Sequence, residues 1–586
     1  KPQRLYFGSQ RVWKSDNRGD SWQPISGDLT RNQNRFDLPI MGSKQSWDNA
    51  WDVLAMSNYN TISAISESPI KPGLLYVGTD DGYIHISEND GKSWRRIEVK
   101  KLAGAPSYAY VNDLKADNFN ENVVYAVLDN HKYGDFRPYV YKSTDKGKSW
   151  RSISSNIPER TLTWRIVQDH VKKDLLFLAT EFGIYFSINS GKRWSKIKGG
   201  VPTISFRDLA IHKRENDLVG ASFGRGFYVF DDMSVFRELS NTQMQSPASL
   251  FSVRKAWWYI PRSHLGFGDR PKGTQGDSYF TAKNPPFGAV FTYYLKSDSK
   301  SSLAIRQDKE KALLKDGKSV GFPGWDAVEK ERRELKSEVI FVVSNSKGEI
   351  VRRLNAPAKQ GFHRIAWDLR YPSPSVINNS GRQNSMLGFM APPGKYSVKM
   401  FLNNNGQVSQ MSKEQFFDVV PLREGALPTK SHDEIAAFWR LYENTIKIAS
   451  SIQTEISNLM TTIEKTKLAL DQSRSSSGDI ETKYSLLRNK ILDLDERVSG
   501  NRSKSGPGEK NNPTVSSRLY VVGRIMEYST YGPTETAKEQ LELSQKELSS
   551  IEDTLDNLDN DLNALLTVIY NSGGPLIEGK TGSITK

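Results

Sequence analysis

The sequence predicts a multidomain, mainly β protein: a partial β-propeller, then an Ig-like β-sandwich, then an antiparallel helical bundle. Three observations predict this order. An eight-residue motif returns four times in the first third of the chain, alternating apolar residues follow further on, and a helical period of apolar residues begins at Ser431. Such changes of period separate domains, and 586 residues are enough for about four of them.

The motif is S-x-(D/N)-x-G-x-x-W, and each copy follows a β-rich segment. Asn and Asp tolerate left-handed backbone and bond their own main chain, glycine supplies a positive φ, and serine bonds locally, so we expect a tight turn between strands. We expect the tryptophan to fold back between neighbouring sheets and bury about 150 to 250 Å². The motif residues are Ser15, Asn17, Gly19, Trp22, Ser87, Asn89, Gly91, Trp94, Ser143, Asp145, Gly147, Trp150, Ser187, Asn189, Gly191 and Trp194.

The repeat predicts propeller blades at residues 1–27, 59–98, 108–154, 162–198 and 203–238. In the first blade, "RLYFGS", "RVWKS" and "SWQPI" supply three outer strands, and no innermost strand precedes them. The last blade is expected to use four strands of its own, the fourth being "VFREL". We therefore expect the missing strand to come from the N-terminal remainder of the same protein, and the total number of blades stays open.

The four motifs resemble the Asp-box of BNR-repeat β-propellers, which sialidases, two-propeller xyloglucanases and ten-bladed sortilin-type receptors share. The resemblance covers residues 1 to about 238, and three copies carry Asn where the family prefers Asp. Phrases such as "YVGTDDG" and "LLFLATEFGIYFS" are similar to large secreted bacterial proteins of the sortilin-like group, often labelled glycosyl hydrolase. The resemblance implies an extracellular, cell-surface or periplasmic bacterial protein.

The remaining chain divides by composition and period. We expect a Gly-, Pro- and Ser-rich linker, an Ig-like sandwich with a charged insertion, a helical bundle and a flexible tail. In the bundle, Ser431 and Glu434 predict a capping box at the start of one long helix, and a second long helix is expected over 534–569 with a third candidate at 478–497. The ranges are 239–284 for the linker, 285–421 for the sandwich, 300–337 for its insertion, 430–570 for the bundle and 571–586 for the tail.

Composition excludes several kinds of site. The chain has no cysteine, so it has no disulfide and no thiolate ligand. Its seven histidines never lie three or four residues apart, and we expect neither metal nor cofactor. No apolar run is long enough to span a membrane. The formal charge of +14 fits either a solvated basic surface or an anionic glycan or membrane partner, whereas no motif indicates nucleic-acid binding.

Polar residues at the starts of the predicted innermost strands and at hairpins form the candidate binding site. Their amide, carboxylate and guanidinium groups suit a polar ligand in the central channel. The alternative is that they pair with one another, Arg207 with Asp208 or Asp113 and Arg225 with Glu181. The candidate channel residues are Asn60, Asp81, Asn112, Asp113, Arg165, Glu181, Arg207 and Arg225, and aromatic residues that either stack on a ligand or fill gaps between blades are Trp47, Trp51, Tyr59, Tyr108, Tyr110 and Trp164.

Catalysis has weaker support. A sialidase distributes its arginine triad around the ring, whereas Arg165, Arg207 and Arg225 lie in two adjacent predicted blades. A xyloglucanase-type hydrolase needs two carboxylates about 5 to 9.5 Å apart, and acidic residues in loops are commonly turn formers. The carboxylates near the channel are Asp80, Asp81, Asp113, Glu181 and Asp208.

We therefore expect a secreted or cell-surface propeller protein that acts as a non-catalytic binding or assembly module for a protein or glycan partner. Two alternatives stay open. One is a glycoside hydrolase acting on extracellular polysaccharide, and the other is a structural subunit of an outer-membrane or surface complex. The fold alone does not decide between them.

Overall fold

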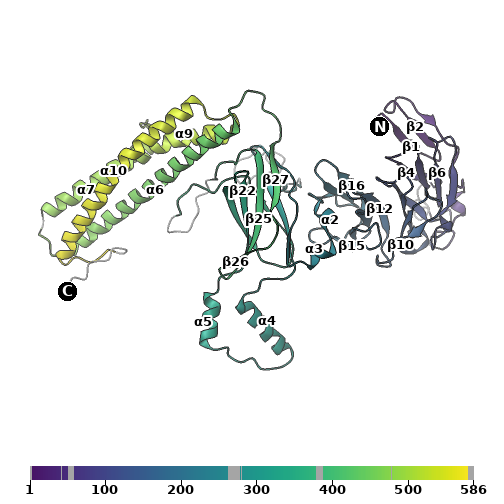
Figure 1. Cartoon of the computed structure of the whole chain (residues 1–586), viewed down its shortest axis with the longest axis horizontal. Helices are drawn as coiled ribbons and strands as arrows, with labels where there is room; N and C mark the ends of the chain where they lie inside the picture. The colour runs from purple at the N-terminus through teal and green to yellow at the C-terminus, as the bar shows by residue number, and fades with distance from the viewer. Residues whose placement is uncertain are drawn as a thin grey trace. The chain divides into compact units, whose positions relative to one another are not determined.

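The structure is a computed structural model of the chain (Figure 1) and describes residues 3–40, 42–49, 59–261, 278, 280–377, 387–476 and 478–577. The chain divides into two compact units, Lys1–Asn241 and Thr242–Lys586. Each unit is described by itself. Taken together, the described residues are mainly β, with helices concentrated towards the C-terminus.

The described part of the first unit contains five antiparallel sheets, and each sheet is built from strands that follow one another along the chain. The unit also has three short 3-10 helices: η1 (Arg35–Asp37) and η2 (Val99–Lys101) lie between sheets, and η3 (His131–Tyr133) joins β9 to β10 within one sheet. The sheets are β1 (Leu5–Gly8), β2 (Val12–Ser15) and β3 (Gln23–Pro24); β4 (Ile62–Glu67), β5 (Leu75–Thr79), β6 (Tyr83–Ser87) and β7 (Arg95–Glu98); β8 (Tyr110–Ala116), β9 (Val124–Asn130), β10 (Asp135–Ser143) and β11 (Arg151–Ser152); β12 (Thr163–Gln168), β13 (Leu176–Thr180), β14 (Gly183–Ser187) and β15 (Ser195–Lys196); and β16 (Phe206–His212), β17 (Asp217–Ser222) and β18 (Phe227–Phe230).

The first strands of neighbouring sheets lie side by side. Ser63 Oγ on β4 donates to the main-chain oxygen of Val111 on β8 at 2.8 Å. The Asn112 amide on β8 donates to the main-chain oxygen of Thr163 on β12, also at 2.8 Å. Antiparallel sheets in chain order, with their first strands adjacent, are the blades of a β-propeller.

All four motifs fold into the same turn. The residue before the glycine and the glycine itself are both left-handed, with φ of 63° and 101° at Arg18 and Gly19, for example. Serine Oγ accepts the glycine N–H at 2.8 to 2.9 Å in the pairs Ser15–Gly19, Ser87–Gly91, Ser143–Gly147 and Ser187–Gly191. The Asn or Asp oxygen accepts a second N–H at 2.9 to 3.0 Å in the pairs Asn17–Ser21, Asn89–Ser93, Asp145–Ser149 and Asn189–Arg193. Asn and Asp thus make the same turn.

The tryptophans of the motifs differ in burial. Trp194 is 3% exposed, and its Nε1–H donates to the main-chain oxygen of Ile153 at 2.7 Å. Trp94 is half-buried and donates to Ile25 in the same way at 3.0 Å. Each acceptor lies three residues after the tryptophan of the preceding motif. Trp150 is half-buried and bonds within its own motif, while Trp22 is 40% exposed.

The fifth sheet differs from the expected four strands. Residues of "VFREL" form a short helix, α2 (Val235–Glu238), so β16–β18 make a three-stranded sheet among the described residues. The aromatic ring of Phe236 packs 4.6 Å from that of Phe186 on the neighbouring sheet, and Arg237 donates to the buried Asp169 at 2.8 Å. The segment also contacts the fifth sheet, since Phe236 packs 5.4 Å from Phe230 and Arg237 donates to Asn216 at 2.8 Å, so it bridges the two sheets instead of adding a strand.

The first sheet has three strands. A Cβ on Gly8 of β1 would meet Ile62 of β4, just as one on Gly78 of β5 would meet Val111 of β8. Strand β1 therefore has the position of a second strand, and no described residue pairs with its other edge. That upstream sequence supplies the first strand stays a prediction.

The second unit begins with two sheets around one core. The segment expected as a linker contributes two of their strands, β19 and β20, because its aliphatic residues Ala248, Leu250, Val253 and Ala256 are buried in the core and Trp258 packs against it. Phe291, Phe341 and Trp367 are fully buried between the sheets. The orders are β19-β21-β24 and β20-β27-β25-β22-β23 with β26 on β25; the bounds are β19 (Ala248–Leu250), β20 (Ala256–Trp258), β21 (Ala289–Leu295), β22 (Glu338–Asn345), β23 (Ile350–Pro357), β24 (Gly361–Trp367), β25 (Gly394–Asn404), β26 (Gln407–Gln410) and β27 (Gln415–Pro421). The Ig-like topology stays a prediction.

The helices of the second unit include the predicted long pair. The capping box is confirmed: Ser431 Oγ accepts the Glu434 N–H at 3.2 Å, and Glu434 accepts the Ser431 N–H at 3.0 Å. The charged insertion expected at 300–337 forms two helices, α4 and α5. The helices are α3 (Asn241–Gln245), α4 (Ser302–Lys315), α5 (Trp325–Arg333), α6 (His432–Asp471), α7 (Asp479–Ser499), α8 (Arg502–Ser505), α9 (Val515–Glu527) and α10 (Glu535–Asn571), with α3 starting at the boundary between the units.

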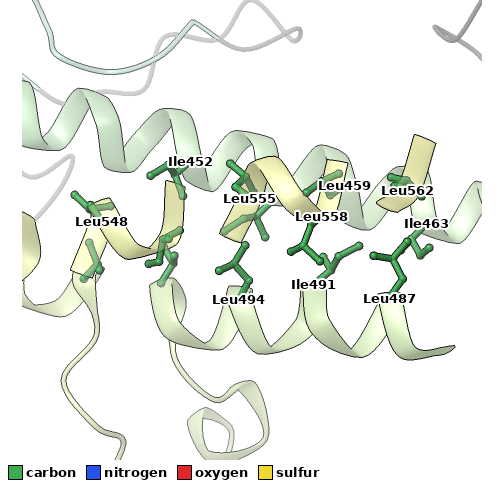
Figure 2. Packing of buried hydrophobic residues seen from close by; sticks show 14 of the residues in the cluster. Ile452, Leu459, Ile463, Leu487, Ile491, Leu494, Leu548, Leu555, Leu558 and Leu562 are labelled. Carbon is green, nitrogen blue, oxygen red and sulfur yellow. The ribbon is translucent and has the colours of Figure 1, made fainter. Parts of the chain in front are cut away.

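The two longest helices, α6 and α10, run parallel to each other. Thr445 near the start of α6 accepts a hydrogen bond from Gln545 near the start of α10 at 3.0 Å, and the main chain of Arg474 bonds Ser572 beyond their other ends at 2.8 Å. Helices α7 and α9 follow α6 and precede α10 in the sequence, and they return the chain to the end of the bundle where α6 began. Figure 2 shows the shared core, in which Ile463 of α6, Leu487 of α7 and Leu562 of α10 meet at one end.

We expect Trp194→Ala to lower the free energy of unfolding of the first unit by about 3 to 5 kcal/mol, because it removes a buried aromatic side chain and leaves a cavity. Trp22→Ala is the matched control, since the same side chain is 40% exposed there, and it should cost far less. Thermal melts of the full chain compare the two. Equal losses would show that the tryptophans do not hold neighbouring sheets together.

His85 on β6 predicts an acid-sensitive first unit. The side chain is 4% exposed, its Nε2 lies 2.6 Å from the main-chain oxygen of Leu29, and burial lowers its pKa to about 4. The unfolded chain takes up this proton near the ordinary value of 6.5. Stability is therefore fully present above that value and falls by up to about 3 kcal/mol as the pH drops to about 4. Melts of His85→Gln should depend less steeply on pH than wild type; equal slopes would contradict the assignment.

Candidate ligand-binding site

Four consecutive sheets of the first unit line one cavity of about 380 Å³, which we call the inner-strand cavity. Their first strands β4, β8, β12 and β16 contribute one or two residues each, and the end of β9 with the following η3 contributes the rest. The lining residues are Ser63, Tyr110, Asn112, Asp129, His131, Lys132, Trp164 and Arg207. The cavity therefore lies where the first strands of neighbouring blades meet.

Lys132 supplies a buried cation to this cavity. Its Nζ is inaccessible and has no hydrogen-bond partner among the residues that the structure describes. It lies 5.3 Å from the centre of the Tyr110 ring. Burial lowers the pKa of Lys132, and the charges of Asp80 and Asp129 oppose that shift without bonding the ammonium. A buried ammonium without hydrogen bonds is costly, so an acidic group that reached it would be favoured.

Local sequence explains why Lys132 is held there. β9 ends at Asn130, and residues 131–133 form a single 3-10 turn that closes at Gly134, whose φ is 76°. Asp129 is 2% exposed; its Oδ1 accepts the main-chain N–H of His131 at 3.2 Å and also bonds His131 Nδ1. This pair fixes the turn, and Lys132 follows directly.

Arg207 supplies a second, more exposed cation. Its guanidinium lies 3.6 Å from the centre of the Trp164 ring, and its side chain is 42% exposed. Glu181 accepts hydrogen bonds from Trp164 Nε1 at 3.1 Å and from Ser205 Oγ at 2.9 Å, and lies 3.9 Å from Arg207. The carboxylate and the indole together orient the guanidinium, which keeps donors for a ligand because it has five N–H groups.

Five of the eight predicted channel residues form two groups. Asn112 and Arg207 line the inner-strand cavity, and Glu181 supports Arg207. Arg165, not Arg207, pairs with the two aspartates: Nη1 lies 3.1 Å from Asp113 and Nε 3.0 Å from Asp208. Burial raises the pKa of Asp113, and the Arg165 charge opposes that shift. The expected charge pairing exists, with different partners.

Asn60 and Asp81 hold a loop. Asp81 is fully buried and accepts hydrogen bonds from Thr79 Oγ1 at 2.5 Å and from the main-chain N–H of Arg31 at 2.6 Å. Asn60 exchanges two hydrogen bonds with the main chain of Gln33, at 2.5 and 3.0 Å. Both side chains therefore tie the segment after the first sheet to the second sheet. Neither lines the inner-strand cavity.

Arg225 lies outside the cavity, in an exposed turn between β17 and β18 whose flanking Gly224 and Gly226 have positive φ. Among the predicted aromatic residues, Tyr110 and Trp164 line the cavity, while Tyr59 is 5% exposed and Trp47 77% exposed. Trp51 lies outside the described residues. No pairing of Arg225 with Glu181 is present in the described part of the chain, because Glu181 faces Trp164 and Arg207.

Sequence analysis missed the segment 129–132. Its signal was a lysine in the hairpin that follows β9, where Gly134 closes a tight turn. No group of three or more His, Asp or Glu that could hold a metal is found within the described ranges. Among the described helices, none combines the length and apolar character needed to cross a membrane.

No family model and no curated protein matches the chain. Similar solved structures include the Swd1 β-propeller domain of Myceliophteria thermophila (15% identity, 43% of this chain and 73% of that one, TM-score 0.29). Others are YCF48 from Cyanidioschyzon merolae (15%, 30% and 53%, 0.22) and the GH74 xyloglucanase from Xanthomonas campestris (11%, 73% and 65%, 0.30). The chain spans less than two thirds of the length of YCF48 and of the GH74 xyloglucanase. The strand order and the contacts between first strands, not these matches, identify the propeller.

We expect Lys132→Met to raise the free energy of unfolding by about 1 kcal/mol, because it replaces a buried ammonium without hydrogen bonds by an apolar side chain of similar length. Lys14→Met is the matched control: Lys14 is also mostly buried, but its Nζ lies 2.8 Å from Asp90 and 3.3 Å from Asp16. It should therefore destabilise. Thermal melts decide, and a loss of stability in Lys132→Met would show that its ammonium is satisfied.

Proposed function

We propose that the propeller is a non-catalytic binding module of a secreted or cell-surface protein and that its inner-strand cavity receives an acidic group of a protein or glycan partner. The observation that carries this proposal is Lys132, whose ammonium is buried on the cavity wall with no hydrogen-bond partner among the described residues. Natural proteins rarely leave such a group unsatisfied unless it has a role.

The composition of the cavity favours a carboxylate or sulfate as the bound group. Arg207 presents a planar fork that matches two acceptor oxygens, and Lys132 adds a point charge. The amide of Asn112 and the ring of Tyr110 line the same cavity. Uronic acids, sulfated sugars and acidic peptide side chains share this chemistry, with polar oxygens beside a small apolar body.

A hydrolase receives less support, because the carboxylates considered for it are engaged by other residues. Asp80 accepts the main-chain N–H of Thr61 at 2.8 Å, and Asp81, Asp113, Glu181 and Asp208 have the partners described above. A glycosidase instead needs one protonated and one ionised carboxyl facing the substrate. The structural-subunit alternative stays open, and the binding experiment below bears on it.

The proposal predicts a charge-dependent affinity for acidic ligands. We expect the full chain to bind polygalacturonate, a sulfated oligosaccharide or a Glu-rich peptide in calorimetry, and Lys132→Met or Arg207→Gln to weaken that binding by about ten-fold or more. Affinity should fall as the pH rises through the lowered pKa of Lys132, because the ammonium then loses its proton.

The control is Arg214→Gln, which removes a 75% exposed guanidinium outside the cavity and should leave the affinity unchanged. If wild type binds none of the three ligands, or if the cavity variants bind as wild type does, the cavity is not the binding site. A structural role in an assembly would then be the better account.

A further inference from the structure

Helices α4 and α5 form a hairpin between β21 and β22 (Figure 1). Neither helix has a buried residue, so the hairpin has no hydrophobic core. An ion pair joins the helices instead: Arg306 of α4 lies 2.8 Å from Glu331 of α5, and Glu310 of α4 lies 2.7 Å from the same arginine. The hairpin therefore consists of two solvated helices, and its apolar side chains are available for contact with a partner because they do not form a core.

The loop that joins the two helices ends in an exposed aromatic pair. Residues 316–325, which we call the hairpin tip, read "DGKSVGFPGW". Phe322 and Trp325 are 64% and 79% exposed, and their rings contact edge to face with centroids 5.0 Å apart. Gly324, with φ 90°, and Pro323 shape the loop between them. Two such side chains held in water are unfavourable, so the tip gains from an apolar surrounding.

Lysines precede this aromatic pair in the sequence. Lys311 and Lys315 of α4 and Lys318 of the tip are all exposed, and the stretch 311–325 contains one acidic residue, Asp316, with Asp326 following directly. The glutamates of the hairpin bond its arginines: Glu331 and Glu310 bond Arg306, and Glu329 bonds Arg332 and Arg333. None of the three lysines forms a salt bridge within the described part of the chain, although the charge of Lys311 reaches Asp308.

We propose that the hairpin tip docks on an anionic lipid surface, with Phe322 and Trp325 entering the interface and the lysines lying against the headgroups. Tryptophan is favoured at the boundary between headgroups and acyl chains, and lysines near such a surface add electrostatic attraction. The tip forms a convex loop on a charged stem. It therefore suits a soft, flat, negatively charged surface.

The test is co-sedimentation of the full chain with vesicles of equal parts phosphatidylglycerol and phosphatidylcholine, compared with vesicles of phosphatidylcholine alone. Wild type should bind the anionic vesicles, and added salt should weaken binding. Phe322→Ala with Trp325→Ala should lower the partition coefficient by about ten-fold or more. Lys315→Glu with Lys318→Glu should lower it by a similar factor and flatten the salt dependence.

Matched controls come from the sandwich region. Phe416→Ala removes an aromatic ring that is 73% exposed, and Lys347→Glu with Lys413→Glu makes the same charge change at two exposed lysines; both should bind like wild type. Equal binding to neutral and anionic vesicles, or wild-type binding by the tip variants, overturns the proposal. Loss of a protein partner without loss of vesicle binding in the tip variants overturns it too, and would assign the tip to a protein surface.

Discussion

The hydrogen bond from a motif tryptophan to the main chain of the preceding sheet is the interaction on which the first unit depends. Trp94 and Trp194 each cover an apolar sheet face and donate Nε1–H to an isoleucine oxygen three residues after the preceding tryptophan. An indole that covers a face and also satisfies its own N–H fixes both the distance and the angle between two sheets. At the junction of the third and fourth sheets, which Trp194 joins, the neighbouring first strands also meet through the bond from Asn112 to Thr163, 51 residues away.

The inner-strand cavity follows from that spacing. Each sheet contributes a different chemical group at the same level of the first strands: an amide from Asn112, an indole from Trp164 and a guanidinium from Arg207. No single sheet could assemble this set. The buried ammonium of Lys132 is unfavourable on its own, and it is held there because the Asp129 and His131 pair fixes the turn. A rigid scaffold can hold a cation at a buried position that lowers the stability of the fold and raises the affinity for an acidic group.

Features that depend on residues close together in the sequence could be predicted, whereas features that depend on contacts between distant segments could not. The motif turn depends on neighbours within eight residues, so its letters suffice, and the capping box at Ser431 is equally local. The helix α2 was missed because Phe236 is held by a ring from another sheet. Lys132 was missed because only the meeting of four sheets shows that a hairpin lysine faces a cavity.

The two proposed sites both use basic residues of a chain whose formal charge is +14, but one site is buried and the other is exposed. Salt therefore screens the attraction of the two sites for an anion to different extents. Lys132 is buried, so mobile ions approach it poorly and its attraction for an acidic group persists at moderate salt. Lys315 and Lys318 are exposed on a solvated hairpin, where the screening length is about 8 Å at physiological ionic strength. Moderate salt should therefore weaken the attraction of the hairpin tip for an anionic surface before it weakens the attraction of the cavity for an acidic group.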